Sequence, residues 1–151
     1  PLPDSMVADA LRGFLPDMDS EERAALARLS GGSIGAALAL ADGDAALLAE
    51  AADRLIGSAR DPDPVALHAL GEKIGRIRDG LSLYGDFLLN ALVTRVRARA
   101  RAGLNAEGWA RVALRLEELF ARADGLNLEP RQKVLSAARL LSATARRGGG
   151  P

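Results

Sequence analysis

The stretch Leu29–Leu40, LSGGSIGAALAL, decides how this chain folds. Its two adjacent glycines, Gly31 and Gly32, predict the end of one amphipathic helix, because glycine readily ends a helix in the left-handed conformation. Ser33 then stands where an N-cap belongs, ahead of a short apolar helix. A glycine-rich turn before a helix N-terminus can bind phosphate, but the lysine of a P-loop and the GxGxxG pattern are both absent. Spacing alone therefore favours a tight turn between two helices.

Helical spacing of apolar residues continues on both sides of this stretch, and no segment alternates apolar and polar residues as a half-buried strand does. Two helices are expected before it, one capped by Asp4 and one opened by the capping box Asp19–Glu22. Five longer helices are expected after it. Residues that are expected to cap or begin these later helices are Asp44, Asp63, Ser82, Asn105 and Asn127.

The sequence thus predicts an all-α protein with three short helices followed by a bundle of about five. We place the three-helix domain at 1–42, the five-helix domain at 43–147 and a disordered tail at 148–151. The short helices are too short to be stable alone, so they must pack against one another. Gly71 and Gly75 lie four residues apart and could allow a neighbouring helix to approach closely. The commoner explanation of such glycines is that they only lower the stability of their own helix.

Composition limits the possible functions. The 151 residues include 20 basic and 20 acidic side chains, so net charge gives no general attraction to nucleic acid or anionic membrane. The chain has no cysteine, which excludes disulfides and thiolate metal sites and fits the cytoplasm, where we expect the protein. No apolar run approaches the ~20 residues that a membrane span needs.

Catalytic and metal-binding patterns are not found. The single histidine, His68, lies beside apolar positions of a helix and is expected to be a surface or partly buried residue rather than a ligand. Most paired carboxylates fall at helix starts and turns, where acidic residues are favoured. We therefore expect no catalytic residue, no metal, no cofactor and no small-molecule substrate.

One charge cluster stands out, TRVRARAR at 94–101, which contains Arg95, Arg97, Arg99 and Arg101. On a helix, alternate residues lie about 200° apart, so these four side chains divide between two sides. One interpretation is a helix end where cations are favoured by the dipole. The other is a contact surface for acidic partner subunits or a nucleic-acid backbone, without base stacking because no aromatic residue is interleaved.

The central stretch also resembles the lid helix of AAA+ clamp-loader subunits, which has the pattern GS-x-R-x-AL-x-L. Gly32 and Ser33 match its start, and Ala37, Leu38 and Leu40 match its apolar positions. In that family the arginine, called sensor 2, contacts the γ-phosphate of ATP. Here Gly35 occupies the arginine position, which makes the motif degenerate.

The segment 127–141, NLEPRQKVLSAARLL, is similar to the last helix of the delta-prime class of bacterial DNA polymerase III clamp-loader subunits. The resemblance implies an AAA+ lid at 1–42 and a collar domain at 43–147, as the non-catalytic C-terminal part of such a subunit. Its partners would be the other clamp-loader subunits, contacted through the collar, with DNA met only indirectly through the assembled complex.

Two other functions remain open. The chain could be a stand-alone helical adaptor that binds a partner helix in a groove. The chain could also be an enzyme that uses arginine and carboxylate side chains. This function is less favoured, because the sequence shows no set of titratable residues that would gather in one active site.

Overall fold

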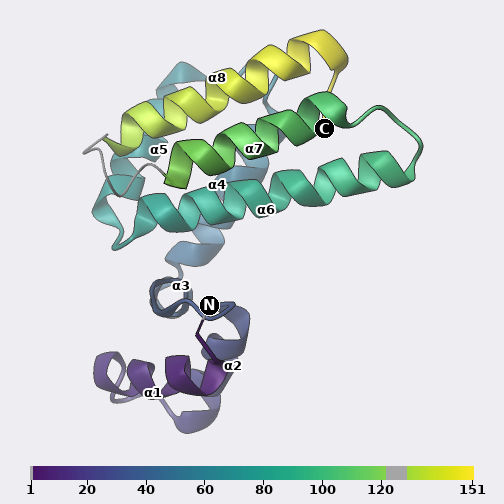
Figure 1. The fold of residues 1–151 in the computed structure, drawn as a ribbon. Coiled ribbons are helices and arrows are strands. Elements are labelled where there is room, and N and C mark those ends of the chain that lie inside the picture. Colours follow the sequence, from purple (N-terminus) through teal and green to yellow (C-terminus); the bar gives the residue numbers. More distant parts are fainter. Residues whose placement is uncertain (1, 122–128) are drawn as a thin grey trace. The chain divides into compact units, whose positions relative to one another are not determined.

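The computed structural model describes residues 2–121 and 129–151, and within these ranges the chain is all-helical, with eight α-helices and no strand (Figure 1). The predicted all-α class is therefore confirmed. The expected helix end at Gly125 and cap at Asn127 lie outside the described residues. In chain order the helices are α1 (Asp4–Phe14), α2 (Ser20–Leu29), α3 (Ile34–Ala41), α4 (Asp44–Gly57), α5 (Pro64–Arg76), α6 (Gly80–Arg101), α7 (Glu107–Ala121) and α8 (Pro130–Gly148).

The contacts between these helices divide the chain into two compact units, residues 1–47 and 48–151. In the first unit, α1, α2 and α3 all pack against one another. Val7 and Leu11 on α1, Ala27 on α2 and Ala37 on α3 are fully buried and form its core. Small alanine side chains at two of these four positions let the short helices approach closely.

Local capping explains where several helices begin. The Asp19 carboxylate accepts a hydrogen bond from the Glu22 N–H at 2.8 Å, and Asp63 caps α5, which has Pro64 in its first turn. The expected start of the longest helix at Ser82 is wrong, because α6 already begins at Gly80. The expectation that Asp4 and Asp44 are N-caps is also wrong, because each of these two aspartates is the first residue of its helix. In that first turn their negative charge still interacts favourably with the helix dipole.

The second unit is a bundle in which α5 packs on α8 and α6, and α7 packs on α6 and α8. Figure 1 shows α6, α7 and α8 as long rods that lie side by side. Their facing sides bury the core of the unit, which includes Leu88, Leu92, Leu116, Val134 and Leu141.

Glycine at position 71 permits the close approach of α5 and α8. A Cβ atom added at Gly71 would lie 2.6 Å from the Cα of Arg131, whereas one added at Gly75 would lie 3.6 Å from Pro130, an ordinary contact. Gly71 therefore allows the close approach of a neighbouring helix, and the alternative, that this glycine only weakens its own helix, is wrong at this position.

Two polar side chains lie in the interior of the second unit. Lys133 on α8 is almost fully buried, and its ammonium donates a hydrogen bond to the Leu119 carbonyl near the C-terminal end of α7. Cations are favoured beside the last carbonyls of a helix. Tyr84 on α6 is fully buried against the edge of Phe120, and its hydroxyl has no hydrogen-bond partner in the described part of the chain. Burial raises the pKa of Tyr84 well above its usual value.

Candidate functional site

The stretch that resembles a lid motif, which includes Gly32, Ser33 and Gly35, lies in the first unit at the start of α3. Gly31 and Gly32 both have left-handed backbone angles, with φ of 60° and 86°, so the tight turn depends on glycine. The Ser33 hydroxyl accepts a hydrogen bond from the Ala36 N–H at 3.2 Å, which makes it the predicted N-cap. Gly35 lies in the first turn of α3 and is half-buried.

The turn leads directly into the N-terminus of α3, and α3 itself carries no positively charged side chain. The sequence of α3, IGAALALA, contains no ionisable residue. The Gly32 carbonyl accepts a hydrogen bond from the Leu2 N–H at 3.0 Å, so the turn is also tied to the segment before α1. Glycine at position 35 offers no donor beyond its backbone N–H, and the site cannot neutralise a terminal phosphate with a side chain.

The four arginines of α6 do not form one surface. Arg95 pairs with Asp53 of α4 at 3.0 Å, and Arg99 donates to the carbonyl oxygens of Asn105 and Gly150 at 2.8 and 2.9 Å. These two side chains therefore hold α6 to neighbouring segments of the second unit.

Arg97 and Arg101 are exposed and, within the described ranges, have no ion-pair partner. Arg95 and Arg99 thus make contacts within the chain that Arg97 and Arg101 do not make, and the contact of the four arginines with a partner stays a prediction. The division into two pairs follows the helical spacing, but the partners of Arg95 and Arg99 come from segments distant in the sequence.

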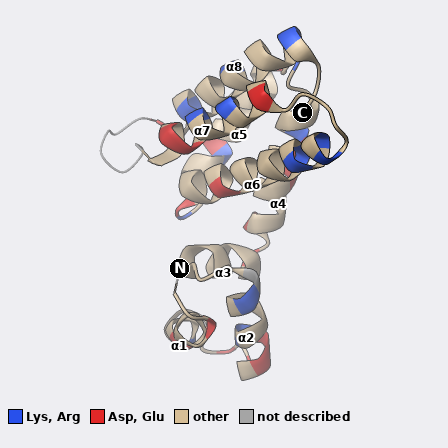
Figure 2. Cartoon of the chain, turned by 45° about the vertical axis from the view of Figure 1, so that its right-hand side comes forward, with Lys and Arg blue, Asp and Glu red and all other residues tan. Residues whose placement is uncertain are grey.

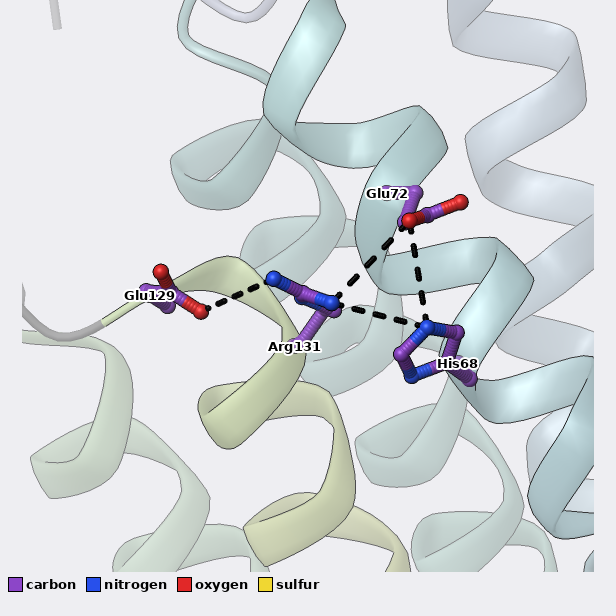
Figure 3. A network of polar contacts seen from close by, with 4 residues as sticks. All are labelled: His68, Glu72, Glu129 and Arg131. Atoms are coloured by element: carbon purple, nitrogen blue, oxygen red, sulfur yellow. Dashed lines mark hydrogen bonds and ion pairs between the residues drawn. The ribbon is translucent and has the colours of Figure 1, made fainter.

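A polar network covers the crossing of α5 and α8 (Figure 3). The Arg131 guanidinium lies 3.3 Å from Glu129, 4.0 Å from Glu72 and 3.5 Å from the His68 ring nitrogen. His68 is exposed, as the sequence allowed, and its ring lies 3.8 Å from Glu72. Exposed ion pairs of this kind contribute about 0–1 kcal/mol each, so the network orients side chains more than it stabilises the fold.

Metal binding finds no support in the described residues, among which no group of three or more histidine or acidic side chains is placed to hold an ion.

A hollow in the second unit lies along the seam of α7 and α8. It consists of two depressions of about 310 and 320 Å³ that share Val112, Arg115, Thr144 and Arg147. We call it the α7–α8 groove. Its arginines come from three helices and are Arg99, Arg111, Arg115, Arg139 and Arg147. Sequence reasoning identified only Arg99 of these, because the others are scattered over separate helices.

Both units carry charges of both signs (Figure 2), but in different proportions. Residues 1–47 contain eight carboxylates and three arginines, for a net charge of −5, and residues 48–151 contain twelve carboxylates and seventeen basic residues, for +5. The neutral total therefore combines an acidic first unit with a basic second unit.

Comparison of the chain with protein-family models, with curated proteins and with solved structures finds no match. None of the helices in the described residues combines the length and the apolar character needed to cross a bilayer.

Proposed function

We propose that this chain is the non-catalytic C-terminal part of a delta-prime-like subunit of the bacterial DNA polymerase III clamp loader. In this role it supports assembly of the pentameric loader, which places the sliding clamp on primed DNA during replication. The chain would thus be an accessory part of a DNA-directed DNA polymerase. Within it, residues 1–42 act as the AAA+ lid and residues 43–147 as the collar.

The observation that carries the proposal is Gly35 at the position of the sensor-2 arginine. The surrounding features of the lid motif are retained, since the glycine turn has left-handed angles and Ser33 caps α3. A helix that keeps this framework but lacks the cation fits a subunit that has lost contact with the γ-phosphate. Its remaining role is to position neighbouring subunits.

The second unit supports an assembly role through its exposed apolar side chains. Val65 on α5 is 77% exposed and Leu114 on α7 is 63% exposed, and Leu104 before α7 is also exposed. Single exposed apolar residues are common on protein surfaces. These three lie on different segments, and neighbouring collar domains can cover each of them in the assembled loader. DNA is contacted only through the assembled complex.

Co-elution on a sizing column tests this proposal. The chain is mixed with the ATP-hydrolysing subunits of a bacterial clamp loader, and a shift of both components into one larger peak is expected. A stand-alone adaptor, the alternative function, would elute unchanged in the presence of these subunits.

Nucleotide titration supplies a second test. We expect no measurable ATP binding by the chain, and none by Gly35→Arg, because these residues include no phosphate-cradling domain. Tight ATP binding by the unmodified chain would contradict a non-catalytic role.

A further inference from the structure

The α7–α8 groove combines an apolar floor with arginines along its edges, an arrangement that the assembly role does not require. We propose that this groove binds a short acidic peptide segment of a partner protein. Apolar side chains of the peptide lie on the floor, and its carboxylates pair with the arginines.

The floor of the groove is formed by apolar side chains of both helices. Trp109, which is 2% exposed, and Val112 come from α7, while Leu140 and Ala143 come from α8. The two depressions share residues and are therefore continuous. Trp109 and Val112 are almost fully buried, so Leu140 and Ala143 offer more of the accessible apolar surface, and a peptide side chain that covers it gains binding energy in proportion to the apolar area.

The edges of the groove carry positive charge that the chain itself leaves largely uncompensated. Arg111 pairs with Glu107, and the Nε atom of Arg147 donates to the Ala143 carbonyl, which holds that side chain in place. Arg115 and Arg139 are exposed and have no ion-pair partner among the described residues. No carboxylate belongs to the described lining of either depression.

The spacing of the arginines fits an extended peptide. Arg139 and Arg147 are eight residues apart on α8, which corresponds to about 12 Å along the helix axis. In an extended or polyproline-like peptide, residues four apart are separated by about 12–13 Å. Carboxylates at such a spacing can reach both ends of the groove, while apolar residues between them lie over the floor.

A peptide fits the groove better than a nucleic acid does. Sequence-independent binding of single strands combines a basic groove with aromatic side chains on which bases stack. The single tryptophan of the chain is buried in the floor, and no other aromatic residue lines either depression in the described part. The apolar side chains of the groove, by contrast, make no favourable interaction with a charged phosphate backbone.

The test is a titration of the full chain with a labelled peptide of sequence ELDELDEL, followed by fluorescence anisotropy and by the emission of Trp109. This peptide repeats every three residues, so in a polyproline-like conformation its leucines share one face with carboxylates on both sides. Matched probes are ESDESDES, which lacks the apolar residues, QLNQLNQL, which lacks the charges, and single-stranded oligothymidine.

Two paired variants locate the binding. Arg115→Ala combined with Arg139→Ala should weaken binding of ELDELDEL by about tenfold, a change equivalent to about 1.4 kcal/mol. Arg97→Ala combined with Arg101→Ala removes the same charge from exposed positions that line neither depression, and it should change binding by less than about twofold, because solvent screens exposed charges that do not contact the peptide. Circular dichroism verifies that both variants retain their helices.

The proposal requires both peptide features, so the serine and the neutral probes should each bind at least about tenfold more weakly than ELDELDEL. Equal binding of ESDESDES would refute the role of the floor. Tighter binding of oligothymidine would assign the groove to nucleic acid instead. Equal losses in the two arginine variants, or no detectable binding of ELDELDEL, would also overturn the proposal.

Discussion

The close approach of α5 and α8 at Gly71 makes a quantitative prediction about a single methyl group. In Gly71→Ala the new Cβ would lie 2.6 Å from both Cα and Cγ of Arg131, about 1 Å inside ordinary van der Waals contact. The Arg131 side chain can rotate, but its Cα belongs to the backbone of α8. The helix itself must therefore move.

The expected cost follows from two opposing terms. Overpacking of this kind costs about 1–3 kcal/mol, while replacing glycine by alanine within a helix returns about 0.5–1 kcal/mol. We expect Gly71→Ala to lower the free energy of unfolding by about 1–2 kcal/mol. In Gly75→Ala the new Cβ is 3.6 Å from Pro130, so only the favourable term applies, and this matched control should gain about 0.5–1 kcal/mol.

Urea unfolding followed by tryptophan fluorescence measures this difference. The single tryptophan, Trp109, lies in the buried core of the second unit, so its emission reports the unit that contains both glycines. The free energies of unfolding of the two variants should differ by about 1.5–3 kcal/mol, with an unchanged dependence on denaturant concentration. Equal stability of Gly71→Ala and Gly75→Ala would refute the reasoning, because it would mean that α8 does not lie against Gly71.

Three further outcomes concern residues whose environment the structure defines. Tyr84→Phe removes a buried hydroxyl without a described partner and should raise the free energy of unfolding by about 1 kcal/mol, measured in urea; a loss of stability would reveal a partner for that hydroxyl. Burial raises the folded-state pKa of Tyr84, so as the pH rises the unfolded chain loses this proton before the folded chain does. The free energy of unfolding should therefore be independent of this group below about pH 10 and should fall above it, by up to about 1.4 kcal/mol per pH unit. Because the chain has one tyrosine, its phenolate absorbance follows this titration directly. Tyr84→Phe should not lose stability above about pH 10 through this group. Ionisation of Tyr84 near about pH 10 in the folded protein would contradict its burial. Ser33→Ala removes the cap of α3 and should cost the first unit about 1 kcal/mol, read by amide hydrogen exchange of α3, with unchanged exchange being the contrary result.

The sequence by itself determined the features that depend on neighbours within about one helical turn. The caps at Asp19, Ser33 and Asp63 and the glycine turn at 31–32 were all predicted, because a cap is a hydrogen bond between residues two or three positions apart. Helical spacing likewise predicted the all-α class. The errors at Asp4, Asp44 and Ser82 are shifts of one or two positions at a helix start.

Only the tertiary structure decided which faces meet. The contact of Gly71 with α8, the burial of Tyr84 and Lys133, and the groove between α7 and α8 all depend on the relative rotation of helices that are distant in sequence. An arginine in a helix has the same local pattern whether it pairs within the fold, as Arg95 does, or borders a groove, as Arg115 does. Local propensity carries no information about the partner across the interface, and that partner is what gives each of these side chains its role.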